Sequence, residues 1–302
     1  MPIEQTDLQG KLPLIARGKV RDLYNVDDNT LLFVATDRIS AYDVIMKNGV
    51  PDKGKLLTKL SEFWFKFLSD EVENHLVKTD NLFNKLPKEL SADLSLKSQL
   101  EDRSLLVRKL KILPLECIVR GYITGSAWAE YKKSGTVHGF EVREGLQESE
   151  AFAEPLYTPS TKAEQGEHDE NIHPDKAIEI VGQELADGVR ELSLKLYKKA
   201  RDYALEKGII IADTKFEFGV DENNNIVLVD EVLTPDSSRF WSAEKYEVGK
   251  SQDSYDKQYL RDWLTANNYK GVEGVSMPEE VVQKTREKYI EAYELLTGHK
   301  WA

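Results

Sequence analysis

Charged side chains interrupt an otherwise apolar stretch between Ile211 and Trp241. Asp213, Lys215 and Glu217 stand at alternate positions, so in a β-strand all three would share one face. In most strands such a row is the solvated face, opposite a face that is buried. The apolar segment that follows argues for a different role here.

Residues 226–229 are continuously apolar, as in a strand buried on both sides, yet they lead directly into Asp230. A turn centred on Asn223–Asn224 would set Glu217 directly across from Asp230, with both side chains on one face. Two carboxylates placed in this way repel unless a cation lies between them. Oxygen ligands with room for water and phosphate suit magnesium better than zinc. The hairpin therefore predicts a magnesium–nucleotide site, with Lys215 balancing phosphate charge.

A basic turn near the N-terminus is a candidate phosphate loop. Gly18 allows a tight turn, and Lys19 and Arg21 follow at alternate positions. Backbone N–H groups and two cations could then lie over phosphate groups. A basic β-turn without a ligand is the alternative reading.

Residues 112–128 form a second candidate anion site. An apolar strand ends at Arg120, and Gly125–Ser126 opens a helix. The guanidinium, the Ser126 hydroxyl and the helix N-terminus could clamp one anion. A helix-capping serine beside a surface arginine is the other interpretation.

A polar loop, residues 157–174, contains Lys162, His168 and His173. The histidines raise the question of a metal, but no third histidine or cysteine lies nearby to complete a ligand set. We expect a substrate loop. The segment from 144 to 175 shows little periodicity and is expected to be a long functional or disordered loop.

Composition limits the class of protein. The chain has 302 residues and a net charge of −12, which makes a nucleic-acid partner improbable because phosphate backbones require a positive surface. One cysteine, Cys117, excludes an intramolecular disulfide and is expected in a buried strand. No long uncharged apolar segment or signal-like N-terminus is visible, so we expect no membrane association and a cytoplasmic location.

The elements that must position these residues follow an α+β pattern. The first third is rich in expected strands, including 31–35, 104–110 and 116–119. Apolar spacing predicts helices at 55–72, 127–134, 176–207 (with a possible interruption near Gly188), 255–264 and 278–296 (capped by Ser276). We expect two lobes, a small β-rich one at 1–113 and a larger α+β one at 114–302.

Several motifs together resemble one family, the SAICAR synthetases of purine biosynthesis. "ILPLECIVRGYITGS" and "IADTKFEFG" look like its two signatures, and "GKVRDLY", "ATDRISAYD", "DEVLTPDSSRFW" and "DKQYLRDWL" follow the same order. "TPSTKAEQGEHDENI" is similar to the longer, fungal form. The resemblance covers essentially the whole chain.

The resemblance implies a fold and a reaction. ATP phosphorylates the carboxylate of carboxyaminoimidazole ribonucleotide (CAIR), and the amine of L-aspartate displaces phosphate to form an amide, giving SAICAR, ADP and phosphate. The cofactors implied are ATP and Mg²⁺, with nucleotide bound between two lobes as in kinases. The partners are small molecules only, and the long insertion favours a monomer.

The resemblance also assigns roles to residues. Glu217 and Asp230 match magnesium ligands, and Lys215 matches the residue that bridges the reacting groups. The ATP contacts implied are Gly18, Lys19, Val20, Arg21, Lys109 and Glu116, although shorter members often have lysine where this chain has Arg21. The implied substrate contacts are Arg120, Ser126, Asp236, Arg239, Asp37, Ser40, Asp43, Lys162, His168, Lys257 and Arg261. Asp213 and Glu231 receive no role.

Two rival functions share these features. A small-molecule kinase would also combine two lobes, magnesium carboxylates and a phosphate loop, but it needs a base in an HRD-type loop, and "TDRISAYD" lies too early in the chain for that. A non-catalytic nucleotide-binding protein would have no need for Lys215, Glu217 and Asp230 together.

Overall fold

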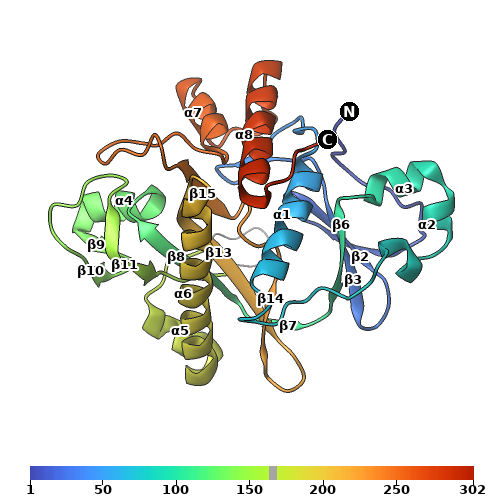
Figure 1. Ribbon diagram of the computed structural model, residues 1–302, viewed down its shortest axis with the longest axis horizontal. Helices are drawn as coiled ribbons and strands as arrows, with labels where there is room; N and C mark the ends of the chain where they lie inside the picture. The colour runs from blue at the N-terminus through green and yellow to red at the C-terminus, as the bar shows by residue number, and fades with distance from the viewer. Residues whose placement is uncertain (163–168) are drawn as a thin grey trace. The chain divides into compact units, whose positions relative to one another are not determined.

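The computed structural model describes residues 1–162 and 169–302, which divide into two compact units (Figure 1). The first unit consists of Met1–Phe63, His75–Lys109 and Asp256–Ala302; the second consists of Trp64–Asn74 and Leu110–Tyr255. Unlike the expected lobe of residues 1–113, the first unit therefore includes the C-terminal segment of the chain.

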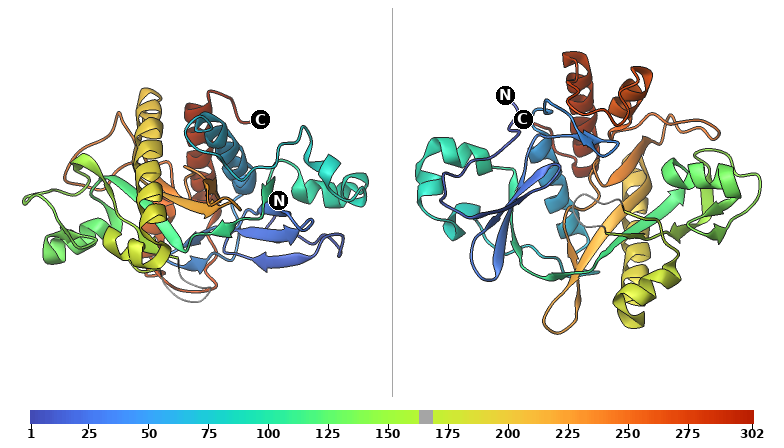
Figure 2. Two further views of the ribbon diagram at one scale, coloured as in Figure 1. Left: turned by 90° about the horizontal axis from the view of Figure 1, so that it is seen from below. Right: turned by 180° about the vertical axis from the view of Figure 1, so that it is seen from behind.

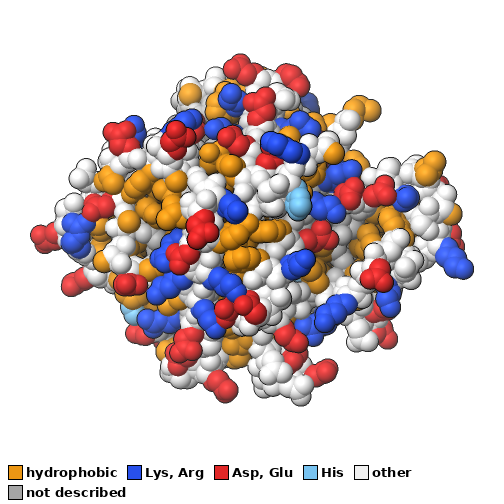
Figure 3. Space-filling view, viewed as in Figure 1, with side chains coloured by type: hydrophobic (Ala, Val, Ile, Leu, Met, Phe, Trp, Pro, Cys, Tyr) orange, Lys and Arg blue, Asp and Glu red, His pale blue; other side chains and the backbone are white. Residues whose placement is uncertain are grey.

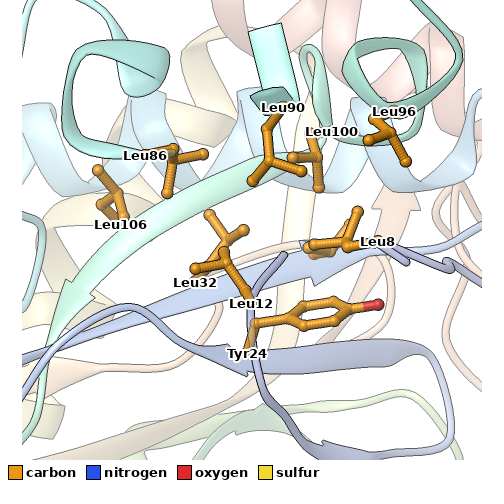
Figure 4. Packing of buried hydrophobic residues seen from close by; sticks show 10 residues of the cluster. Leu8, Leu12, Tyr24, Leu32, Leu86, Leu90, Leu96, Leu100 and Leu106 are labelled. Atoms are coloured by element: carbon orange, nitrogen blue, oxygen red, sulfur yellow. The ribbon is translucent and has the colours of Figure 1, made fainter. Parts of the chain in front are cut away.

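An antiparallel four-stranded sheet forms the base of the first unit. Its order is β1 (Leu14–Arg17), β2 (Arg21–Asn25), β3 (Thr30–Ala35) and β6 (Ser104–Arg108). A leucine-rich core lies between this sheet and the short helices α2 (Glu89–Ala92) and α3 (Leu94–Leu100); Figure 4 shows Leu32 of β3 facing Leu90 and Leu100, with Leu106 of β6 beside Leu86. A 3-10 helix, Leu82–Lys85, precedes α2.

The C-terminal helices belong to the first unit because they share its second core. Helices α7 (Gln258–Ala266) and α8 (Glu279–Thr297) pack their apolar side chains against the segment that carries β4 (Ser40–Ala41) and β5 (Val44–Ile45). The expected serine cap of α8 is wrong: its N-cap is Pro278, and no side-chain capping bond forms.

A seven-stranded sheet forms the second unit. Its central path is β11 (Ala151–Tyr157), β8 (Leu115–Tyr122), β13 (Ile209–Val220) and β14 (Ile226–Val229), to which β7 (Lys111–Ile112), β12 (Ser160–Thr161) and β15 (Ser238–Ser242) add. The expectation of a long loop from 144 to 175 is wrong over β11 and β12. Strand β11 lies at the end of this path and is largely exposed, so its sequence lacks the apolar alternation that would have revealed it.

Helices complete the second unit, with a small hairpin of β9 (Thr136–Val137) and β10 (Phe140–Glu141) beside α4 (Gly125–Ser134). The predicted long helix is broken between α5 (Pro174–Val181) and α6 (Gln183–Glu206), at Gly182 rather than near Gly188. Gly182 has φ +86°, a left-handed backbone that ends a helix. Gly188 instead lets α6 approach β14, because a Cβ there would lie 2.5 Å from Ile226 Cδ1.

Helix α6 covers one face of this sheet, as Figures 1 and 2 show for the yellow helix and the orange and green strands. Cys117 and Phe216 are paired residues on the covered face and are fully buried. Burial raises the pKa of the Cys117 thiol to about 12, so it is a packed strand residue as expected. The opposite face is therefore available for charged side chains.

On the molecular surface acidic and basic side chains are interspersed over the face drawn in Figure 3. Within residues 1–162 and 169–302, no helix has the length and apolarity required to cross a membrane.

Gly121 on β8 lies where α6 leaves no room for a side chain. A Cβ there would lie 1.9 Å from Tyr197 Oη, and that hydroxyl donates a 2.7 Å hydrogen bond to the Ile211 carbonyl. We expect Gly121→Ala to reduce the free energy of unfolding by about 1–3 kcal/mol through overpacking, measured by urea denaturation. Tyr197→Phe removes the obstructing oxygen, so adding Gly121→Ala to it should cost clearly less; additive losses would contradict this packing account.

Candidate active site

The charged face of the central sheet is built by the pairing of β8 with β13. Asp213 lies opposite Arg120, and Lys215 lies opposite Ile118. Extending this register places Glu116 opposite Glu217. The predicted alternation of Asp213, Lys215 and Glu217 thus holds. Asp213 and Glu217 lie opposite charged residues on β8, and Asp213 also pairs with Arg239 on β15.

Lys215 lies among acidic side chains. Its Nζ donates to Glu116 Oε1 at 2.6 Å and lies 3.3 Å from Glu217 Oε1, while Lys162 Nζ bonds the other carboxylate oxygen of Glu217. Burial alone would lower the pKa of Lys215, but the charges of Glu217, Glu116 and Asp230 outweigh burial and raise it. Lys215 is therefore a permanent cation at this site.

Two opposing effects act on the pKa of the Glu116 carboxyl group. Burial raises the pKa of its carboxyl group, and the nearby Lys215 acts in the opposite direction; burial prevails. Glu217 is also buried, with 5% of its surface exposed. The centre of the sheet thus places two partly exposed lysines against carboxylates that are largely buried.

The prediction that Asp230 lies directly across from Glu217 is wrong by one residue: Glu217 pairs with Val229. The hairpin loop has five residues, because Val220 pairs with Ile226 and the Asp221 carboxylate accepts bonds from Asn223 N and Asn225 N. Asp230 follows the end of β14 with φ +70°, which breaks the strand alternation. Its charge still acts on Lys215 and helps raise the pKa of that lysine.

The donor set at this centre suits a hard cation. Glu116, Glu217 and Asp230 offer carboxylate oxygens only, as magnesium prefers, and one or two carboxylates are enough when water and phosphate fill the remaining positions. Among the described residues, no group of three or more His, Cys, Asp or Glu side chains is arranged to hold a metal by itself. Any metal here would therefore require ligands from a bound phosphate or from water.

Arg120 forms a second, anion-binding group at the other end of the row. It is 3% exposed, and its N–H groups meet Thr158 Oγ1 at 3.0 Å, Asp213 Oδ2 at 3.4 Å and Ser126 Oγ at 3.2 Å. Burial lowers the pKa of Arg120 to about 10, so it is still cationic at neutral pH. The predicted proximity of Arg120 and Ser126 is therefore present.

Arg239 joins this group through Asp213. Its Nη1 donates to Asp213 Oδ2 at 2.6 Å, the same oxygen that Arg120 contacts. Two guanidinium groups thus meet at one carboxylate oxygen near the N-terminus of α4, an arrangement that suits a phosphate group.

Gly125 is required for this arrangement. It begins α4 with φ +58°, and a Cβ there would lie 2.3 Å from Arg239 Nη2. The glycine therefore lets the helix backbone come close to the guanidinium, where helix amides and arginine can contact one ligand.

Sequence reasoning missed the roles of Asp213, Thr158 and His138 in holding Arg120. Asp213 had a visible signal, since it belongs to the alternating row, but its two arginine partners lie on different strands. The neighbouring Asp236 lies in a turn in which its amide donates to Thr234 Oγ1 at 3.2 Å. In the same turn the Thr234 hydroxyl donates to the Glu231 carboxylate.

In the first unit, the basic turn connects β1 and β2 and is held by several hydrogen bonds. Gly18 N donates to the Arg21 carbonyl at 2.8 Å, and the carbonyl of Val20 accepts from Thr36. Arg38, which the sequence did not reveal, donates to the carbonyls of Gly18 and Lys19. The turn is thus held mainly through its carbonyl groups, while the Gly18 amide is used within the turn.

Of the other expected contacts in the first unit, Asp37 is buried and holds the backbone, whereas Lys19 and Asp43 are exposed. Asp37 is 1% exposed, and its carboxylate accepts four hydrogen bonds, from Ile3 N, Gly54 N and both Nη atoms of Arg103. These bonds give Asp37 a structural role at the start of α1 (Lys53–Phe67). Lys19 and Asp43 instead form an exposed ion pair at 2.7 Å.

Lys257 precedes α7 and donates to the Ser40 carbonyl at 3.1 Å, so these two residues lie together. Arg261 lies one turn further along α7 and is half-buried. Lys109 is exposed and donates to the Asp27 carbonyl at 2.7 Å, closing the turn between β2 and β3. His168 lies outside the described residues.

The chain is similar to known proteins in both sequence and structure. Residues 14–278 match the SAICAR synthetase family. The phosphoribosylaminoimidazole-succinocarboxamide synthase of Saccharomyces cerevisiae is 68% identical over the full length of both chains. A solved structure of SAICAR synthase from Saccharomyces cerevisiae complexed with SAICAR has a TM-score of 0.94 and 65% identity, covering 99% of each chain. A SAICAR synthetase in complex with ADP has a TM-score of 0.70 and 26% identity, covering 95% of this chain and 99% of the other. The chain belongs to the SAICAR synthetase family.

Proposed function

We propose that the protein is an ATP-dependent ligase that joins L-aspartate to CAIR and releases SAICAR, ADP and phosphate. The observation that carries the proposal is the charged row on β13, which has an arginine-rich anion site at Asp213 and a lysine–carboxylate centre at Glu217. Four residues of strand separate the two by about 13 Å. A ribonucleotide has its phosphate and its base carboxylate at opposite ends, and it could occupy both sites.

The anion site would hold the ribonucleotide phosphate. Arg120 and Arg239 supply planar donors, and Ser126 supplies a hydroxyl beside the helix N-terminus. These groups bind and orient the substrate before any chemistry occurs, which turns the later steps into reactions within one complex. We include Asp236, in the turn before Arg239, among the proposed contacts.

The lysine–carboxylate centre would handle the phosphoryl group. Glu217 and Asp230 would hold magnesium, which when bound offsets the negative charge of the ATP phosphates. Lys215 would then lie against the transferring phosphoryl group as a fixed cation, with its orientation set by Glu116. Lys162, which already bonds Glu217, would add a second cation for the substrate carboxylate.

The reaction needs no protein nucleophile. A carboxylate oxygen of CAIR attacks the γ-phosphorus of ATP, and ADP leaves. The aspartate amine nitrogen then attacks the acyl carbon, an amide bond forms, and phosphate departs as the amine loses its proton. The chain contributes the placement of the reactants and the charges around them. Cys117 is buried and takes no part in this proposal.

Further contacts are proposed residue by residue. The turn Gly18–Arg21, with Lys19 and Val20, would bind ATP phosphates, and Lys109 and Glu116 would contact the nucleotide. Ser40, Asp43, Lys257 and Arg261 would bind substrate groups, with Asp37 acting through the backbone that it anchors. His168 is retained among the proposed substrate contacts. We also retain a monomeric state, small-molecule partners and a cytoplasmic location as parts of the proposal.

Purified protein with ATP, Mg²⁺, CAIR and L-aspartate tests the function directly. We expect ADP release that depends on both CAIR and aspartate, with SAICAR identified by mass spectrometry. ADP release onto a hydroxyl acceptor without aspartate would indicate a kinase instead. Tight ATP binding with no turnover under any condition would indicate a non-catalytic nucleotide-binding protein.

A further inference from the structure

His138 is a buried residue in a tight hairpin turn. It lies with Gly139 between β9 and β10, whose register pairs Val137 with Phe140. The two turn residues have φ +47° and +82°, as a type I′ hairpin turn requires. A histidine in the left-handed region is uncommon, and this one is only 3% exposed. Such backbone strain persists only where the surroundings enforce it.

Glu130 of α4 enforces this turn. One of its carboxylate oxygens accepts from His138 N at 3.0 Å, and the other accepts from Gly139 N at 3.1 Å and from Thr136 Oγ1 at 2.8 Å. The same helix presents Ser126 to Arg120 at its N-terminal end. Helix α4 therefore holds the turn that carries His138 and also contacts the anion-binding arginine through Ser126.

The partners of the imidazole ring determine its tautomer. His138 Nδ1 lies 3.1 Å from the Pro159 carbonyl, which can only accept, so Nδ1 carries the hydrogen. Nε2 lies 3.3 Å from Arg120 Nη2, which can only donate, so Nε2 is the acceptor. Burial and the charge of Arg120 lower the pKa of His138 to about 4, so the ring is neutral at neutral pH.

The bonds of Arg120 show what His138 contributes. Four of the five N–H donors of the guanidinium are accounted for by Thr158, Asp213, Ser126 and His138. Thr158, Asp213 and His138 are buried, whereas Ser126 is exposed. The buried three can fix the plane of the guanidinium while the bond to Ser126 is exchanged for a phosphate oxygen.

We propose that His138 is a positioning residue, whose Nε2 holds Arg120 Nη2 in the orientation that binds the ribonucleotide phosphate. The proposal rests on the proposed function for the identity of the substrate. It also explains why a histidine occupies a position where glycine or asparagine would be less strained. A purely structural histidine would need only bonds from its ring to backbone groups such as those of Pro159 and Ile172, and nothing in that role would require an acceptor for Arg120 at Nε2.

Two substitutions separate positioning from structure. His138→Asn keeps a donor near Nδ1 for the Pro159 carbonyl and tolerates the left-handed backbone, but it removes the acceptor facing Arg120. His138→Gln can place an amide oxygen near the position of Nε2, at some cost in backbone strain. If His138 has only a structural role, the Asn variant should bind CAIR better than the Gln variant. If His138 positions Arg120, the Gln variant should bind CAIR better than the Asn variant.

The experiment measures kcat, KM for CAIR, KM for ATP and the thermal midpoint for wild type and both variants. We expect His138→Asn to raise KM for CAIR about tenfold, the effect of one lost bond to a charged group, with kcat and KM for ATP unchanged. His138→Gln should stay within about threefold of wild type although it melts lower. An unchanged KM for CAIR in His138→Asn, or losses that follow the thermal midpoint, would overturn the proposal.

Calorimetry with ribose 5-phosphate and ribose separates this inference from the ligase function. We expect the phosphate group to increase affinity in wild type and in His138→Gln, and to do so much less in His138→Asn. That result supports positioning even in a protein that shows no turnover, which would count against the ligase function alone. An equal phosphate contribution in His138→Asn and wild type would overturn the role of His138.

Discussion

Asp230→Asn is expected to reduce kcat by about 100- to 1000-fold, the size of effect seen when one electrostatic contact that stabilises a transition state is removed. Asparagine preserves the shape and tolerates the φ of +70° at this position, so the backbone should not change. What is lost is a negative charge that acts on Lys215 and a candidate magnesium ligand. Glu217→Gln should have an effect of similar size.

Steady-state ADP release over a range of Mg²⁺ concentrations measures this effect, and circular dichroism confirms the fold. Glu222→Gln is the matched control, because Glu222 is exposed in the hairpin loop between the same two strands. We expect that variant to behave as wild type. Near-normal kcat in Asp230→Asn at all magnesium concentrations would remove Asp230 from the metal assignment.

Arg120→Lys is expected to raise KM for CAIR by about 10- to 100-fold, with a smaller effect on KM for ATP. A lysine ammonium retains the charge but has no planar fork, so it cannot contact Thr158, Asp213 and a phosphate group together. Lysine is preferable to alanine here, since alanine would leave Asp213 buried with only Arg239 to balance it.

Initial rates at varied CAIR and at varied ATP distinguish the two Michaelis constants. Arg143→Lys is the matched control, because Arg143 lies in the same unit but is exposed and paired with Glu150. If Arg120→Lys raised both constants equally, or lowered kcat alone, Arg120 would not be the phosphate contact that we propose.

The charged row on β13 could be predicted because strand alternation is a local property of sequence. The residues on other strands that pair with this row could not be predicted. The pairing of Asp213 with Arg120 joins strands far apart in sequence, and no local pattern specifies which strands become neighbours. The error at Asp230 has a similar origin, since an odd rather than even loop length moved the register by one residue.

Other differences also arise from tertiary context. The C-terminal helices were recognised from their periodicity, but their membership of the first unit depends on a core shared with residues near Ile39 and Met46. His138 and Arg38 had no sequence signal because each depends on a tight turn: Glu130 holds the turn that carries His138, and Arg38 bonds the carbonyls of the basic turn. Propensity identifies such turns poorly when a distant carboxylate or guanidinium stabilises them.

The single carboxylate oxygen shared by Arg120 and Arg239 has a consequence for genetics as well as for binding. Substitutions at the two arginines should not be independent, because losing either one strengthens the pairing of Asp213 with the other. A sequence change tolerated at Arg239 in one background could therefore be harmful in another. Arg120, Arg239 and Asp213 should therefore change together during evolution. Asp213 contacts no proposed ligand, yet it should be as constrained as the two arginines that do.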